Sequence, residues 1–150
     1  MRAHELAALQ LGDVIDETGR IRDEITLDAS QTKGSHARRV FINAKLKKEL
    51  GSYIKSTCTN GKPTDPLFRS QKRRGFNANT MCQLFGNIYC GCGIIGASSH
   101  SGRRTFITNL ASKSVSVRVL ALLAGHSSIS TTQRYIDVND QQLRNAVELA

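Results

Sequence analysis

Apolar residues recur at helical spacing along most of the chain, which predicts a mainly helical protein. The helices expected from this spacing are residues 2–11, a helix capped by Asn43 that carries Leu46, Leu50, Tyr53 and Ile54, a helix that carries Met81, Leu84, Phe85, Ile88 and Tyr89, and residues 100–112, 116–124, 130–135 and 139–149. Gly12 stands where the first helix is expected to stop, and Gly91 and Gly93 are expected to end the helix that begins before Met81.

Between residues 13 and 43 the pattern changes to short runs that are typical of strands. Val14 and Ile15 form the first run, residues 21–27 the second and residues 39–42 the third. A polar, glycine-containing turn separates the last two runs and places Lys33 near the tip of a hairpin. The expected fold class is therefore mainly α with a small antiparallel β-sheet (α+β). The length of 150 residues suits one domain over residues 1–150.

The charge balance points to a polyanionic partner. Lys and Arg number 21 against 12 Asp and Glu, so the formal net charge is +9. A chain with this charge can bind a phosphate backbone, because binding releases the counterions of the backbone. Ribosomal RNA or an anionic membrane surface would attract the same charge. The sequence holds no apolar run of membrane-spanning length, and its first residues do not resemble a signal peptide. We therefore expect a cytoplasmic, nucleoid-associated protein that does not bind membranes.

The cysteines favour reduced thiols over a metal site or a disulfide framework. They are Cys58, Cys82, Cys90 and Cys92. The close pair Cys90 and Cys92 lacks both the Cys-x-x-Cys spacing and a second close pair, so zinc is not expected. No metal and no other cofactor is predicted.

Three short segments near the C-terminus hold residues suited to phosphate chemistry. His100 and Arg103 stand three residues apart near an expected helix start, so both lie on one helical face. The next buried helix is expected to end at Gly125 and to present His126 just beyond it. Tyr135 follows within the segment Thr131-Thr132-Gln133-Arg134-Tyr135. By itself each residue also fits a structural role, such as a solvated charge, a helix-end histidine or a half-buried aromatic.

The ordered set resembles the tyrosine recombinase (phage integrase) family over nearly the whole chain. The matching motifs are Arg2-Ala3-His4-Glu5-Leu6, Thr32-Lys33-Gly34, His100-Ser101-Gly102-Arg103, Ala124-Gly125-His126 with Ala124 in place of the usual Leu, and Tyr135. The resemblance implies the catalytic-domain fold of that family and site-specific cleavage and rejoining of double-stranded DNA through a 3′-phosphotyrosyl intermediate. It also implies a synapse of four protomers on DNA, although this chain alone is expected to be monomeric.

The chemistry of these residue types agrees with those roles. The guanidiniums of Arg2 and Arg103 suit a clamp on the phosphate oxygens, and His126 adds a further hydrogen bond. Tyr135 is the expected nucleophile, and His100 is expected to accept or relay its proton. Lys33 is the expected general acid for the departing 5′ oxygen, with an ordinary solvated turn lysine as the alternative.

A basic run follows the only prolines of the chain. Arg69, Lys72, Arg73 and Arg74 are predicted to contact DNA phosphates, and the alternative is a solvated loop.

Two departures from the family pattern leave other functions open. The family's catalytic domain normally has a helix before the first Arg motif and a separate helical domain in front of it. We expect both to be absent here, because the first helix begins at Arg2 without a capping residue. The alternatives are a truncated, non-catalytic DNA-binding remnant of an integrase and an enzyme resembling type IB topoisomerases. The compact spacing from His100 to Tyr135 and the expected tail helix favour the recombinase.

Overall fold

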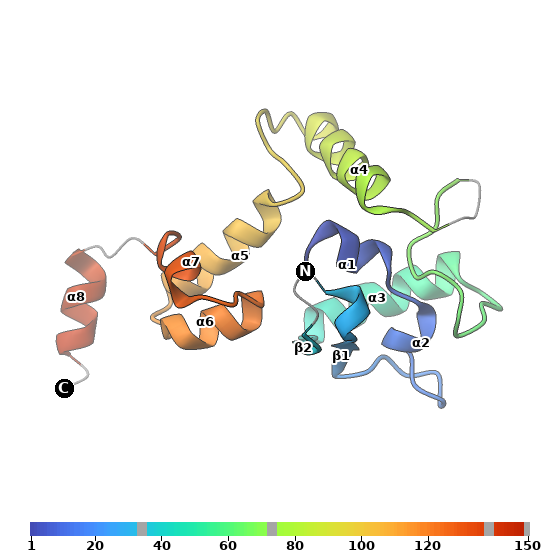
Figure 1. Cartoon of the computed structure of the whole chain (residues 1–150), viewed down its shortest axis with the longest axis horizontal. Helices are drawn as coiled ribbons and strands as arrows, with labels where there is room; N and C mark the ends of the chain where they lie inside the picture. Colours follow the sequence, from blue (N-terminus) through green and yellow to red (C-terminus); the bar gives the residue numbers. More distant parts are fainter. Residues whose placement is uncertain (33–35, 72–74, 137–139, 149–150) are drawn as a thin grey trace. The chain divides into compact units, whose positions relative to one another are not determined.

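The computed structural model describes residues 1–32, 36–71, 75–136 and 140–148. The chain divides into two compact units, Met1–Ser99 and His100–Ala150, and each is described by itself. The expected single domain over residues 1–150 stays a prediction. In Figure 1 the first unit runs from blue to yellow-green and the second from yellow to red.

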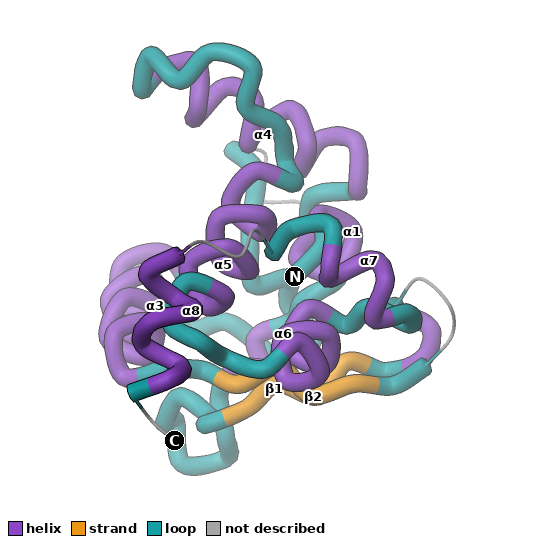
Figure 2. The backbone as a smooth tube through the Cα atoms, turned by 90° about the vertical axis from the view of Figure 1, so that its left-hand side faces the viewer, coloured by secondary structure: helices purple, strands orange, loops and turns teal. Residues whose placement is uncertain are grey.

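The first unit combines helices with one two-stranded sheet (Figure 2). Its elements are α1 (Ala3–Ala7), α2 (Leu11–Val14), β1 (Glu24–Leu27), the 3-10 helix η1 (Ala29–Gln31), β2 (Arg38–Phe41), α3 (Ala44–Thr57) and α4 (Ala78–Gly91). The strands pair antiparallel with Ile25 opposite Val40. Ile25 and Leu27 are buried on one face of β1 because side chains alternate across a strand. The fold class predicted from the sequence, mainly α with a small antiparallel sheet, is confirmed.

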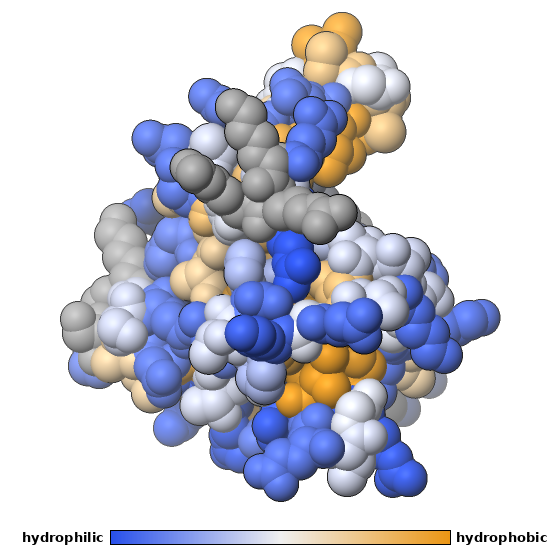
Figure 3. All heavy atoms as spheres, turned by 90° about the vertical axis from the view of Figure 1, so that its right-hand side faces the viewer, coloured by the Kyte–Doolittle hydropathy of each residue, from blue (hydrophilic) through white to orange (hydrophobic). Residues whose placement is uncertain are grey.

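An apolar core holds the first unit together. It gathers side chains from α2, β1, α3 and the loops between them: Leu9, Leu11, Val14, Ile25, Leu27, Ile42, Leu50, Cys58 and Leu67. Asn43 caps α3 as expected, because its side chain accepts a hydrogen bond from the backbone N–H of Leu46 at 2.8 Å. Helix α4 packs against α1. In the space-filling view of Figure 3, hydrophilic residues cover much of the face that is seen.

The predicted single helix over residues 2–11 is wrong. Helix α1 ends at Ala7, and the backbone of Leu9 and Leu11 bonds instead to Leu67 and Asp65, at 2.8 and 2.9 Å. A new short helix, α2, then starts at Leu11 and contains Gly12, which was expected to stop the first helix. Gly12 allows a close approach there, since a Cβ on it would lie 3.1 Å from Pro63 Cβ. Tertiary contacts with the loop before Arg69 therefore override the helical pattern.

The expected strands are shorter than the alternation indicated. Val14 belongs to α2, and Ile15 forms only an isolated bridge with Ile21. The sheet proper begins at Glu24. The 3-10 helix η1 lies between the two strands, in the described part of the expected polar turn. It begins directly after Asp28.

The second unit is a group of short helices. They are α5 (Ser101–Ala111), α6 (Val117–Ala124), α7 (Ile129–Gln133) and α8 (Asp140–Val147), close to the predicted stretches. Helix α6 packs against both α5 and α7. The buried side chains on these faces are Ile107, Ala111, Leu120, Ala121, Ala124 and Thr132. In the described ranges of both units, no helix is long and apolar enough to cross a bilayer.

Candidate active site

One face of α5 and the segment after α7 enclose a cavity in the second unit. The cavity has a volume of about 200 Å³ and is lined by His100, Arg103, Arg104, Ile107 and Tyr135. Four of these residues come from α5 and its N-cap. Arg103 and Arg104 follow His100 by three and four positions, and Ile107 follows Arg103 and Arg104 by four and three, so all four lie on one face of the helix. Tyr135 comes from the turn that follows α7. A phenol, an imidazole and two guanidiniums therefore line one small cavity.

His126 lies beside the Tyr135 ring. The two ring centroids are 6.1 Å apart with 28° between the ring planes, which is a stacked arrangement. The Nδ1 atom of His126 lies 2.8 Å from Oγ1 of Thr132, a residue of α7. This histidine is thus held between the helix that precedes it and the segment that carries the tyrosine.

The end of α6 explains how His126 is presented. Gly125 adopts a left-handed conformation with φ of 65°, and its N–H donates to the carbonyl of Leu122 at 3.0 Å. The N–H of His126 donates to the carbonyl of Ala121 at 2.9 Å, which completes a Schellman motif. The guanidinium of Arg103 donates to the carbonyl of Ala124 at the end of the same helix. The negative end of α6 therefore anchors Arg103 while the turn delivers His126.

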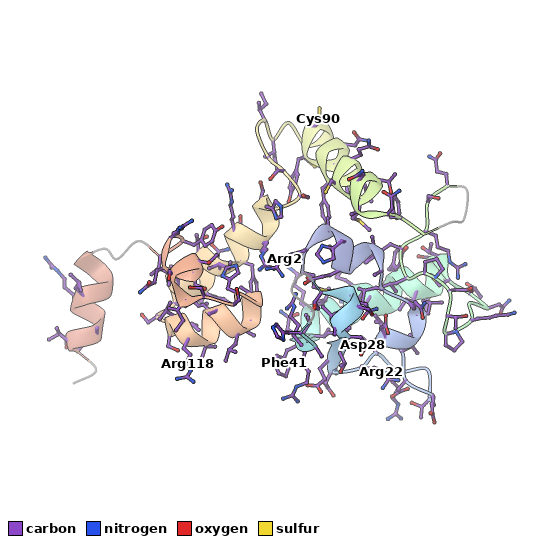
Figure 4. All side chains as sticks on the ribbon, viewed as in Figure 1. Arg2, Arg22, Asp28, Phe41, Cys90 and Arg118 are labelled. Carbon is purple, nitrogen blue, oxygen red and sulfur yellow. The ribbon has the colours of Figure 1, made fainter. Side chains whose placement is uncertain are left out.

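Arg2 lies in the first unit, where a buried carboxylate holds it. Glu5 is fully buried and accepts from the backbone N–H of Arg2 at 2.6 Å and from its guanidinium at 3.3 Å. The Arg38 guanidinium donates to the same carboxylate at 2.7 Å. Arg2 is labelled at the start of α1 in Figure 4. Arg2 makes no side-chain cap hydrogen bond at the start of α1, as the sequence indicated, but Glu5 in the first turn accepts from the backbone N–H of Arg2.

The surroundings of Glu5 set its titration. Burial by itself raises the pKa of this carboxyl, but the backbone hydrogen bond from Arg2 and the guanidiniums of Arg38 and Arg2 outweigh it. The pKa of Glu5 therefore lies below its ordinary value. The ionised carboxylate is the form that orients Arg2.

Glu5→Gln is expected to destabilise the protein by about 3 kcal/mol, because it leaves the half-buried Arg38 and Arg2 without their counter-charge. Since folding lowers the pKa of Glu5, its contribution is present above the ordinary glutamate pKa and is lost as pH falls through the lowered value. Urea unfolding at neutral and acidic pH measures both effects. Glu17→Gln, at an exposed carboxylate, is the comparison. Equal losses in the two variants would contradict the role given to Glu5.

Comparison with known proteins decides the family. Residues 1–142 match the model of the phage integrase family. The chain belongs to this family.

Named relatives agree with that assignment. The chain is 33% identical over 148 residues to a tyrosine recombinase of Pseudothermotoga lettingae, covering 98% of this chain and 48% of the relative. It is 30% identical to the tyrosine recombinase XerC of Caldanaerobacter subterraneus, covering 98% of this chain and 40% of the relative. The chain thus spans about half the length of the curated relatives that it matches.

Solved structures share the fold. The crystal structure of XerA recombinase matches 99% of this chain and 51% of its own chain, with a TM-score of 0.76 and 28% identity. The Tn1549 transposon integrase in complex with a circular intermediate DNA matches with a TM-score of 0.70 at 22% identity, which is a likeness of fold alone. The fold is therefore that of tyrosine recombinase catalytic domains.

The family's other expected site residues fall into two groups. Lys33, Lys72, Arg73 and Arg74 lie outside the described residues. Arg69 is described, and its guanidinium bonds to the carboxylate of Asp65 at 2.9 Å. Its predicted contact with DNA stays a prediction. In the described part of the chain no group of three His, Cys, Asp or Glu side chains gathers as a metal-ligand set.

Several residues of this integrase-family site were missed by the sequence reasoning. Arg104 and Ile107 line the Tyr135 cavity, and their spacing from His100 and Arg103 was a signal that could have found them. Arg38 contacts Glu5, the carboxylate that also binds Arg2, and Thr132 contacts His126. No local pattern marks those two contacts.

Proposed function

We propose that this chain cleaves and rejoins double-stranded DNA at specific sites, through a covalent bond between Tyr135 and a 3′-phosphate. The observation that carries the proposal is the cavity that Tyr135 shares with His100 and Arg103, with His126 stacked on the tyrosine ring. Membership of the phage integrase family supports it. The family relatives are named tyrosine recombinases.

The cavity residues suit an in-line displacement at phosphorus. The Tyr135 oxygen attacks the phosphodiester, so a tyrosyl–phosphorus bond forms while the bond to the 5′ oxygen breaks. A phenol is largely protonated at neutral pH, so His100 accepts or relays the phenolic proton. The 5′ oxygen leaves as a hydroxyl after taking a proton from Lys33. Attack by a 5′-hydroxyl on the phosphotyrosyl bond reverses the step and reseals a strand.

Positive groups offset the charge that develops on the nonbridging oxygens. The guanidinium of Arg103 offers two parallel N–H donors from inside the cavity. The guanidinium of Arg2 is expected to donate to the same phosphate in the same way. Arg104 adds a positive charge at the same cavity. All these charges belong to side chains of the protein itself.

The proposed partners follow from the charge and the surface of the chain. Duplex DNA suits the net charge of +9, and the proposed place of action is the nucleoid in the cytoplasm. Leu143 and Val147 are exposed apolar residues of α8. They support docking of this helix on another recombinase protomer in a DNA-bound tetramer, in line with the family resemblance.

A nicked-duplex trap tests the proposed function. The full chain is incubated with a library of nicked duplexes of randomised sequence, from which a short 5′-hydroxyl strand escapes after cleavage. The expected result is an SDS-resistant protein–DNA adduct whose DNA shares a common sequence and whose linked peptide contains Tyr135. DNA binding without any adduct would support a non-catalytic binder and overturn the proposal. Relaxation of supercoiled plasmid without a preferred sequence would point to topoisomerase activity instead.

A further inference from the structure

Thr132 is one of the few polar residues buried in the described chain. Its side chain is 0% exposed, and it lies in α7 three positions before Tyr135. Its hydroxyl oxygen lies 2.8 Å from Nδ1 of His126. Its backbone carbonyl accepts a hydrogen bond from the N–H of Tyr135 at 3.0 Å. One residue therefore contacts both the imidazole and the segment that carries the phenol.

The burial of Thr132 decides which partner donates the hydrogen. If Nδ1 of His126 donated, the hydroxyl hydrogen of Thr132 would need another acceptor, and within the described residues its hydroxyl bonds only to His126. A buried hydroxyl donor without an acceptor is costly. The arrangement that satisfies both groups has the Thr132 hydroxyl donating to Nδ1. In the neutral imidazole the ring hydrogen then resides on Nε2.

We infer that Thr132 is a positioning residue, which holds His126 as the Nε2–H tautomer and fixes its ring beside Tyr135. The inference rests on the proposed function for its role in cleavage, because a phosphate oxygen accepts a hydrogen bond only from a nitrogen that carries hydrogen. The backbone bond from Tyr135 to Thr132 links the tyrosine to the same residue. Thr132 thus contacts the segment that carries the Tyr135 nucleophile and also determines which ring nitrogen of His126 carries the hydrogen.

Nitrogen NMR on the full chain without DNA tests the tautomer. At a pH where the imidazole is neutral, wild-type His126 is expected to show a protonated Nε2 and an unprotonated Nδ1. In Thr132→Val, which keeps the shape and removes the hydroxyl, the two tautomers are expected to mix. Thr131→Val removes an exposed hydroxyl from the next position and is expected to leave the spectrum unchanged. A wild-type His126 protonated at Nδ1 overturns the inference.

Cleavage of the nicked duplex tests the consequence. Loss of the hydroxyl is expected to slow adduct formation by about tenfold, while Thr132→Ser retains most of the rate and Thr131→Val all of it. If Thr132→Val does not fold, Thr132→Ser and Thr132→Ala form the pair that isolates the hydroxyl. Equal rates with and without the hydroxyl overturn the inference. Because the NMR arm needs no DNA, a wild-type protein that forms no adduct would defeat the proposed function and leave the tautomer measurement decisive.

Discussion

Replacing Tyr135 by phenylalanine is expected to abolish the covalent DNA adduct while leaving the fold nearly unchanged. The phenylalanine ring can still occupy the cavity and stack on His126, as the tyrosine ring does at 6.1 Å. The substitution removes only the oxygen that attacks phosphorus, so the expected loss of cleavage is more than about 10³-fold. Adduct formation on nicked duplex, quantified on denaturing gels, measures the effect.

The other tyrosines of the chain provide matched controls. Tyr53 donates its hydroxyl hydrogen to the carbonyl of Leu67 at 3.1 Å, and Tyr89 lies on α4. Tyr53→Phe and Tyr89→Phe are expected to form the adduct at the wild-type rate once their stability is matched. An adduct that persists in Tyr135→Phe and disappears in one of these variants would assign the nucleophile elsewhere.

Local patterns were sufficient for much of the second unit. The spacing of His100 and Arg103 predicted a shared helical face, and both line one cavity. Gly125 was expected to end a buried helix and present His126, and its left-handed backbone does so. Both inferences depend on residues close in sequence, where helix periodicity and the conformational freedom of glycine act directly.

Contacts between distant segments account for what the sequence did not reveal. The break after Ala7 arises because Leu9 pairs with the backbone of Leu67, a partner far along the chain. The same holds for the ion pair between Glu5 and Arg38. Neither partner has a periodicity that points to the other. Helical propensity is a weak prior, and such tertiary bonds override it.

The guanidinium of Arg103 is expected to contribute the largest electrostatic effect on cleavage. Arg103→Ala is predicted to slow adduct formation by about 10²–10³-fold, because it removes a forked donor from the cavity where charge develops on phosphorus oxygens. Arg103→Lys is expected to recover part of this loss, since an ammonium restores the charge without the planar fork. Single-turnover rates on the nicked duplex measure both variants.

Arg103 also donates to the carbonyl of Ala124, so its loss has a structural component. Thermal unfolding separates this component from the chemistry, because a loosened contact between α5 and α6 lowers stability whether or not DNA is present. Arg118→Ala, at an exposed residue of α6 (Figure 4), removes the same charge away from the cavity and is expected to reduce only salt-dependent DNA affinity. If Arg103→Ala and Arg118→Ala slowed cleavage equally, the effect would come from net charge, and Arg103 would have no particular role at the phosphate.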